Sequence, residues 1–261
     1  MNKDKLVMSD GASIAWQLDG PADAPTLLLS NSLGTDREMW KYQLTDFTRY
    51  FRVLRYDTRG HGLSDAPQGG YGLDRLGRDA LELLDALDIQ KAFFCGVSLG
   101  GMTGQWLGVH APERIERMAL ANTAAYMGPA TGWQTRIETV LSKGIKAISR
   151  DVLDRWFTPE YLKQNLPAIE ELAASLNECQ PHGYAGCCAA IRDMDMRPTT
   201  KLIKCPTLVI IGLRDPATPP VLGEFLVDNI PGAKSDLLDT AHLSNIECPT
   251  QFNAAVLDFV R

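Results

Sequence analysis

Short apolar runs alternate with longer amphipathic stretches along much of the chain. The run PTLVIIG at 206–212 is apolar at most positions, which is typical of a strand buried on both faces. The stretch at 73–88, LDRLGRDALELLDALD, places leucines at a helical spacing. Strands that alternate with helices predict a mostly parallel sheet with helices on both faces. We predict strands at 13–18, 25–30, 52–57, 91–96, 115–122, 206–212 and 235–240, with further helices at 99–110 and 250–260.

Residues 124–197 interrupt this alternation. The segment has aromatic and helical patterns but no clear strand, and we predict helices at 132–148 and 167–178. We expect the segment to form a helical cap over the strand ends, inserted between two strands of the sheet. The α/β core would then comprise residues 1–123 and 198–261, and the cap residues 124–197.

The composition is that of a globular protein with a sizeable core. Of the 261 residues, 45% are hydrophobic and 22% are charged. A net charge of −6, with no basic run, argues against a nucleic-acid partner. The apolar stretches are too short to cross a bilayer, and the first residues, MNKDKLVMSDGAS, have no apolar signal core. We therefore expect a cytoplasmic protein without a membrane partner.

The cysteines give no sign of a metal site. None of the six forms a CxxC pair, and no histidines cluster near them. Because the chain is neither small nor visibly secreted, we expect reduced thiols rather than disulfides. They stand at positions 95, 179, 187, 188, 205 and 248.

A serine among glycines stands between the strand predicted at 91–96 and the helix predicted at 99–110. The sequence there is CGVSLGGM, and a strand–GxSxG–helix unit is the nucleophile elbow of α/β hydrolases. The serine backbone is strained in such a turn, so small residues are needed two positions before and after it, as Gly96 and Gly100 are. GxSxG alone is a weak signal, because glycines also serve tight packing. In this context it predicts an α/β-hydrolase fold with Ser98 as nucleophile.

A serine hydroxyl needs a base to attack at neutral pH, and the chain has four histidines. In this fold the histidine follows the final strand, which favours His242 in DTAHLSNIE. His61 follows a strand in RGHGLS, where a structural role in a loop is as reasonable as any other. His110 ends the elbow helix, where a positive side chain suits the dipole, and His182 lies in the cap.

The third member of the triad must be an acid between the serine and the histidine in the chain. Asp215 in IIGLRDPATPP comes just after a predicted strand, and the following prolines would stiffen its loop. An Asp-Pro pair is also common in plain surface turns. The other usual acid position follows MALAN, which offers Asn122 and no carboxylate. We therefore assign the acid to Asp215.

Two backbone amides should form the oxyanion hole, one just after the nucleophile and one from the loop after an early strand. Leu99 is the first of these positions. The loop LLLSNSLGTD places Leu33 at the second, with Asn31-Ser32 where many hydrolases have His-Gly. Because backbone N–H groups do the work, this change need not harm catalysis.

Several stretches point to one family within this fold. The chain resembles the 3-oxoadipate enol-lactonases of bacterial aromatic catabolism over nearly its whole length, although Leu99 stands where methionine is frequent in that family. Cap sequences vary most among α/β hydrolases, so similarity there bears on the substrate. The similar stretches are LSNSLGTD, MW, FRVLRYDTRGHGLS, GQWLG and AHLSNIE in the core, and WQTRIETVL, RWFTP and YAGCCAAIRDMD in the cap.

The resemblance implies hydrolysis of 3-oxoadipate enol-lactone to 3-oxoadipate in the β-ketoadipate pathway. Ser98 would attack the lactone carbonyl, His242 would take its proton, and the Leu33 and Leu99 amides would bind the oxyanion. The ring would open by expelling an enolate, and water would clear the acyl-enzyme. The partner is then a small anionic lactone, and no metal or organic cofactor is needed.

The implied substrate carries a carboxylate, so a local cation must compensate the net negative charge of the protein. On the helix predicted at 132–148, Arg136 lies about 60° from Trp133, at the edge of an apolar stripe. We predict that Trp133 and Arg136 bind substrate and that Arg136 takes the carboxylate through two hydrogen bonds. The alternative is that Arg136 reaches water or pairs with a nearby acid. The stripe comprises Trp133, Ile137, Val140 and Leu141, and the reserve cations are Arg150, Arg155 and Arg192.

Two rival functions remain open at this point. A different carboxylesterase or a carbon–carbon bond hydrolase could use the same triad, and a perhydrolase activity could accompany it. A non-enzymatic small-molecule receptor could keep the fold, although Ser98, Asp215 and His242 together argue against it. Dehalogenation is disfavoured, because that chemistry needs a carboxylate nucleophile at position 98.

Overall fold

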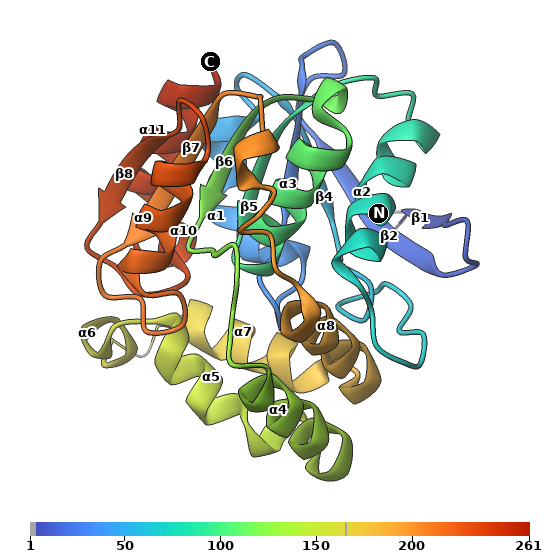
Figure 1. The fold of residues 1–261 in the computed structure, drawn as a ribbon, viewed down its shortest axis with the longest axis vertical. Coiled ribbons are helices and arrows are strands. Elements are labelled where there is room, and N and C mark those ends of the chain that lie inside the picture. Colours follow the sequence, from blue (N-terminus) through green and yellow to red (C-terminus); the bar gives the residue numbers. More distant parts are fainter. Residues whose placement is uncertain (1–3, 165) are drawn as a thin grey trace.

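The computed structural model describes residues 4–164 and 166–261. Its centre is an eight-stranded sheet in the order β1-β2-β4-β3-β5-β6-β7-β8 (Figure 1). Strand β2 pairs antiparallel with β1 and β4, and the other neighbouring strands pair in parallel. The strands are β1 Asp4–Val7, β2 Ser13–Asp19, β3 Thr26–Ser30, β4 Arg52–Tyr56, β5 Ala92–Val97, β6 Ile115–Ala121, β7 Thr207–Gly212 and β8 Lys234–Leu238.

Helices cover both faces of this sheet. On one face lie α2, α3 and α9, and on the other α1 and α11 pack together (Figure 1). The inner strands β3 and β7 are buried at every residue, as their continuous apolar sequences predict. The predicted α/β fold with a mostly parallel sheet is therefore confirmed. These helices are α1 Lys41–Phe47, α2 Leu73–Ala86, α3 Leu99–His110, α9 Pro220–Asn229 and α11 Pro249–Val260, with the single turn α10 Ser244–Glu247.

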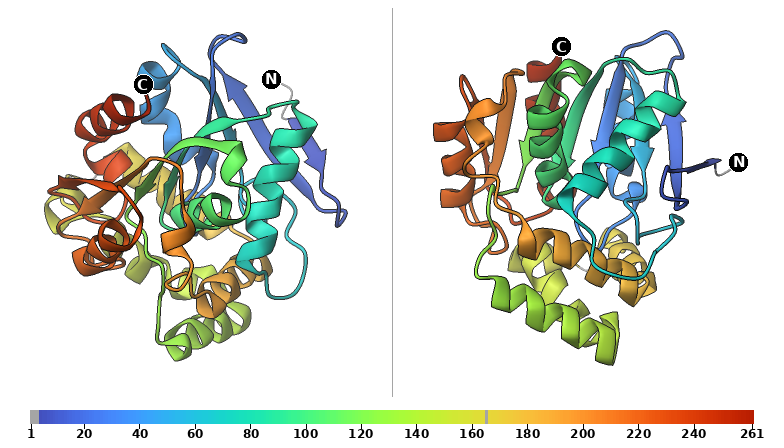
Figure 2. Two further views of the ribbon diagram at one scale, coloured as in Figure 1. Left: turned by 45° about the horizontal axis from the view of Figure 1, so that its top comes forward. Right: turned by 45° about the vertical axis from the view of Figure 1, so that its right-hand side comes forward.

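A separate layer of helices lies between β6 and β7 in the chain. These helices gather beyond one end of the sheet (Figures 1 and 2), and α4 packs along α8. This layer falls within the segment 124–197, and its treatment as a cap distinct from the core stays a prediction. The helices are α4 Ala130–Lys143, α5 Ser149–Trp156, α6 Pro159–Leu162, α7 Pro167–Glu178 and α8 Pro181–Asp193.

Short 3₁₀ turns complete the regular structure: η1 Arg37–Trp40, η2 Pro112–Arg114, η3 Ile145–Ala147 and η4 Thr200–Leu202. Among the residues that the structure describes, no helix combines the length and the apolar character needed to cross a membrane.

One predicted helix is shorter than its sequence pattern suggested. The helix expected at 132–148 is α4, which ends at Lys143 because Gly144 takes a φ of 77°. The predicted apolar stripe is also wrong at Leu141, which is 48% exposed. Since α4 packs against α8 on one side only, Val140 is its single fully buried residue and the stripe is narrower than expected.

Candidate active site

Ser98 occupies a sharp turn between β5 and α3. Its backbone has φ 58° and ψ −115°, a strained conformation for a residue with a side chain. Strand β6 and the loop after it hold the turn, since Ser98 N donates to Ala121 O at 2.9 Å and Thr123 Oγ1 donates to Ser98 O at 2.7 Å. A Cβ on Gly96 would collide with the backbone of Gly100, so the expected need for small residues is real.

His242 and Asp215 come together from loops that follow β8 and β7. His242 Nδ1 lies 2.8 Å from Asp215 Oδ2, and both side chains are buried. The other carboxylate oxygen of Asp215 accepts backbone N–H bonds from Ala217 and Thr218 at 2.8 and 2.9 Å. The loop that the prolines stiffen therefore fixes the carboxylate and, through it, the orientation of the imidazole.

The charge of Asp215 is maintained against its burial. Burial alone would raise the pKa of this carboxyl, but the charge of His242 and hydrogen bonds from His242 and Thr218 outweigh it. The pKa of Asp215 is therefore lowered from its ordinary value. An ionised carboxylate at this place stabilises a positive charge on His242.

Asn122 also belongs to this site. The sequence analysis noted it only because it stands, without a carboxylate, at the other usual position of the acid. It follows β6 with a φ of 46°, and its Nδ2 donates to Asp215 Oδ2 at 3.0 Å and to Ala241 O at 3.1 Å. Its Oδ1 accepts a hydrogen bond of 2.6 Å from Ser244 Oγ. Asn122 thus holds the acid loop and the histidine loop together. Its place at a strand end, between those of Ser98 and Asp215, was the available signal.

The predicted oxyanion residues lie at the same edge of the sheet. Leu33 follows β3 and lines the pocket that holds Ser98, and Leu99 is the buried first residue of α3. Within 4–164 and 166–261, neither the Leu33 N–H nor the Leu99 N–H donates a hydrogen bond. Two unused amide donors are therefore available near Ser98, as an oxyanion hole would require.

His61 holds the loop that carries Leu33. Its Nε2 accepts a hydrogen bond of 2.9 Å from Gly34 N–H, and its Nδ1 lies 3.2 Å from Arg59 O. The ring is therefore the neutral tautomer with a proton on Nδ1. Burial lowers the pKa of His61 to about 4, because a charged ring would lose its solvation. Of the roles that the sequence left open for His61, the structure shows the one in the loop: its ring accepts the Gly34 N–H.

The remaining histidines lie away from Ser98. His110 ends α3, where its ring stacks on Trp106 with centroids 4.4 Å apart. His182 is exposed near the start of α8. Neither lines the pocket that holds Ser98 and His242.

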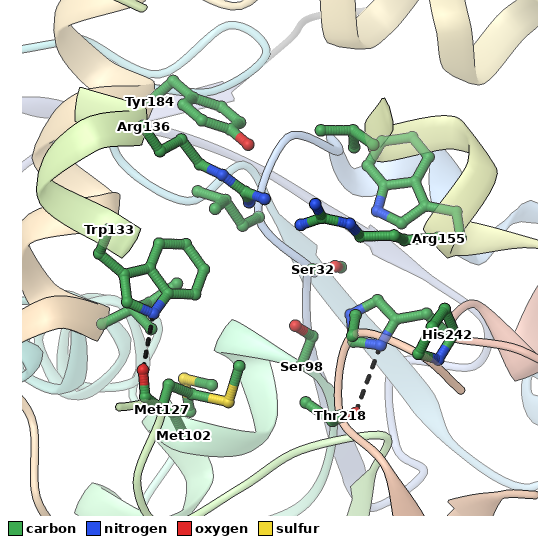
Figure 3. Close-up of a pocket in the computed structure, with 16 residues that line it drawn as sticks. Ser32, Ser98, Met102, Met127, Trp133, Arg136, Arg155, Tyr184, Thr218 and His242 are labelled. Carbon is green, nitrogen blue, oxygen red and sulfur yellow. Dashed lines mark hydrogen bonds between the residues drawn. The ribbon is translucent and has the colours of Figure 1, made fainter. Parts of the chain in front are cut away.

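A pocket of about 130 Å³ lies between the ends of the sheet strands and the helices α4, α5 and α8. Ser98 and His242 reach into it from the core, while Trp133, Arg136 and Arg155 reach into it from α4 and α5 (Figure 3). No hydrogen bond joins Ser98 to His242 within the described part of the chain; such bonds often tighten only when substrate is bound. Apolar side chains form most of the remaining wall: Leu33, Met102, Met127, Val152, Trp156 and Ile191.

The structure separates the candidate cations. Arg136 lines the pocket, with its guanidinium carbon 4.9 Å from the ring centroid of Trp133. Arg155 also lines the pocket. Arg150 points away, with an 82% exposed side chain that pairs with Asp154, and Arg192 pairs with Asp193 and Gln134.

The site combines a strained serine, a buried Asp–His pair and unused amides. A comparison of the whole sequence with known protein families agrees with this geometry. The sequence pattern of the alpha/beta hydrolase fold matches residues 25–249. The chain belongs to the alpha/beta hydrolase family.

Among the described residues, no group of three or more His, Cys, Asp or Glu side chains could hold a metal ion.

Similar proteins within this family confirm the resemblance seen in the sequence. The 3-oxoadipate enol-lactonase 2 of Acinetobacter baylyi is 43% identical over 97% of this chain and 95% of its own. The crystal structure of the enol-lactonase from Burkholderia xenovorans LB400 is 41% identical, with a TM-score of 0.97 over 98% of this chain and 99% of that one. A hydrolase from Pseudomonas aeruginosa PA01 is 50% identical, with a TM-score of 0.97 over 99% and 98%.

The chain order of the candidate residues agrees with the order found in alpha/beta hydrolases. Ser98, Asp215 and His242 follow β5, β7 and β8, so the serine comes first and the histidine last. Parallel strands bring these three loops to one edge of the sheet, where ligands usually bind in open α/β folds.

Proposed function

We propose that this chain hydrolyses 3-oxoadipate enol-lactone to 3-oxoadipate, with Ser98, His242 and Asp215 as the catalytic triad. The observation that carries the proposal is the Asp215–His242 pair, 2.8 Å apart, in the pocket of a strained serine. Relatives that bear the name enol-lactonase match 97% and 98% of the chain, which supports the choice of substrate. The small pocket, with two arginines in its wall, suits a compact anionic ligand.

In the first step, Ser98 Oγ attacks the carbonyl carbon of the lactone while His242 takes the hydroxyl proton. Asp215 keeps the Nδ1 proton of His242 in place, so Nε2 is free to act as the base. The carbonyl oxygen becomes an oxyanion, which the N–H groups of Leu33 and Leu99 bind. These donors are already fixed by the loop and the helix start, so little reorganisation is needed.

Collapse of this intermediate breaks the bond between the carbonyl carbon and the ring oxygen. The ring oxygen leaves as an enolate and receives the proton from His242. An enolate leaves more readily than an alkoxide, and the resulting enol relaxes to the ketone. The acyl group remains attached to Ser98 as an ester.

Water completes the reaction. His242 removes a proton from the water, which attacks the ester carbonyl, and the same amides bind the second oxyanion. The bond to Ser98 Oγ breaks, the serine regains its proton from His242, and the product leaves with two carboxylates. Every step uses groups of this chain and water.

Arg136 binds the carboxylate that the lactone already carries. It lines the pocket that holds Ser98, and Trp133 supports its guanidinium group through a cation–π contact. A guanidinium group binds a carboxylate through two parallel hydrogen bonds. Trp133 offers its ring as an apolar wall for the lactone, since its Nε1 donates to Met127 O at 2.8 Å.

The six cysteines support a cytoplasmic location. All are free thiols, and five of them are buried. Disulfides are rare where thiols are kept reduced, so this pattern suits a protein that works inside the cell.

A substrate comparison tests this function. The purified protein is offered the enol-lactone, a neutral ester of similar size and a carbon–carbon hydrolase substrate, and kcat/KM is measured for each. The lactone should be the best substrate by at least about a hundredfold, because it alone combines the enolate leaving group with the carboxylate. A higher kcat/KM for either of the other two substrates would show that the triad catalyses a different reaction.

A further inference from the structure

The described contacts of Arg155 show no structural role for its side chain. It lies near the end of α5 and forms no hydrogen bond or ion pair with any residue in the described part of the chain. Arg150, five residues earlier on the same helix, pairs with Asp154, and Arg192 on α8 pairs with Asp193. Arg155 is exposed, so water solvates its guanidinium in the free protein, and a ligand in the cavity can reach it.

Arg155 also stands where two cavities meet. It lines the pocket of Ser98 and a neighbouring cavity between α4 and α5, and Arg136 lines both as well. The guanidinium groups of the two arginines point toward one another across the pocket (Figure 3). The neighbouring cavity holds one exposed carboxylate, Asp151, whereas the described residues lining the pocket of Ser98 include none.

Tyr184 on α8 supplies a third polar group. Its side chain is fully buried, and its hydroxyl forms no hydrogen bond of ordinary geometry with a described residue, although the Arg136 guanidinium lies close enough to oppose the rise in the Tyr184 pKa that burial causes. It lines the pocket, and the hydroxyl is directed toward the guanidinium of Arg136 (Figure 3). A buried hydroxyl without a partner is destabilising, so its retention beside two cations points to a ligand that completes its hydrogen bonding.

We propose that Arg155 and Tyr184 join Arg136 in a carboxylate clamp on the cap side of the pocket. The clamp deepens the proposed function and rests on it: it makes the site selective for small lactones and esters that carry a carboxylate. Two guanidinium groups from α4 and α5 bind the carboxylate oxygens, and the Tyr184 hydroxyl donates from the buried side.

Adipate, a six-carbon dicarboxylate without an ester, probes the clamp without turnover. Its affinity is measured by calorimetry for the native protein and for Arg155→Met, Arg155→Lys, Tyr184→Phe and Arg150→Met. Arg155→Met should weaken adipate binding about ten- to a hundredfold, the range for a hydrogen bond to a charged group, and Tyr184→Phe about three- to tenfold. The adipate affinity of Arg155→Lys should lie between those of the native protein and Arg155→Met, because lysine keeps the charge and loses the planar guanidinium group.

Arg150→Met is the matched control, since it removes the same charge from the same helix outside the pocket. Its adipate affinity should equal that of the native protein. Unchanged binding in Arg155→Met, or an equal loss in Arg150→Met, would overturn the clamp. Thermal melting of each variant establishes that the fold is intact before binding is compared.

Kinetics in parallel separate the clamp from the proposed reaction. The ratio of kcat/KM for the lactone to that for a neutral ester should fall at least about tenfold in Arg155→Met. Lactone hydrolysis with no change in this ratio would reject the clamp and keep the function. Adipate binding that depends on Arg155 in a protein that leaves the lactone intact would keep the anion site and reject the function.

Discussion

Asn122 donates a hydrogen bond of 3.0 Å to Oδ2 of Asp215, the same oxygen that lies 2.8 Å from His242 Nδ1. The amide and the imidazole therefore share one carboxylate oxygen, and Thr218 Oγ1 adds a third bond of 2.6 Å to it. This arrangement leaves the carboxylate little freedom to rotate. The orientation of the imidazole follows from that restriction.

Asp215→Asn should lower kcat by about 10³- to 10⁴-fold, because the amide would favour the wrong tautomer of His242. KM should change little, since Asp215 does not line the pocket. Steady-state kinetics with the lactone provide the measurement. A loss of less than about tenfold would mean that another group orients the imidazole.

Asn122→Ala should lower kcat about tenfold with little change in KM, because Asp215 loses one of its positioning bonds. It should also lower the free energy of unfolding by about 1–3 kcal/mol, since Ser244 Oγ loses its buried partner. Ser244→Ala is the matched control, because it removes the same bond to Asn122 and leaves Asp215 untouched. Equal kinetic losses in the two variants would show that Asn122 acts through general stability alone.

Arg136→Met should lower kcat/KM for the anionic lactone. The decrease should correspond to a loss of about 1.5–3 kcal/mol in transition-state stabilisation, the range for a hydrogen bond to a charged group. The reduction for a neutral ester of similar size should be much smaller. Kinetics on the two substrates test this difference. Equal losses on both would mean that Arg136 supports the packing of α4 and that other residues bind the carboxylate.

The stability of the protein should depend on pH through His61. The pKa of this buried ring is lowered to about 4, whereas it returns to about 6.5 on unfolding. The unfolded state therefore binds the extra proton first, and stability should fall as the pH drops from about 6.5 to about 4, by up to about 3 kcal/mol. Denaturant unfolding at a series of pH values measures this slope.

His61→Gln provides the control, because its side-chain oxygen can still accept the Gly34 N–H and does not titrate. The slope between pH 6.5 and 4 should be flatter in this variant, whose other titrating groups are unchanged. The same slope in both proteins would assign the acid sensitivity to groups other than His61.

The central strands and the elbow were predictable because their signals are local. Continuous apolar runs predicted β3, β5, β6 and β7 with boundaries within one residue of those in the structure. The stretch GVSLGG predicted the turn at Ser98. Strand β1 was missed, since its four residues are largely exposed at the sheet edge and carry little apolar pattern. Helix α9 was missed because the prolines before it, and Pro220 at its first position, read as a loop.

The relations between distant residues needed the structure. No spacing in the sequence indicates that Asn122 contacts Asp215, or that His61 accepts from Gly34, because these contacts join separate loops at the sheet edge. In α4, helical periodicity placed Leu141 on the buried stripe, but only the packing of α4 on α8 decides which positions are covered. The structure also distinguishes Arg155, which lines the pocket beside Arg136, from Arg150 and Arg192, which the sequence offered with it only as reserve cations.

The most direct test follows lactone disappearance and 3-oxoadipate formation with the native protein and with Ser98→Ala. The native protein should convert the lactone stoichiometrically to 3-oxoadipate. The variant should fold and melt like the native protein and lose at least about 10⁴-fold in kcat, keeping only the residual rate that binding and the oxyanion amides supply. A native protein that leaves the lactone intact, or a Ser98→Ala variant that opens it at a near-native rate, would contradict this account.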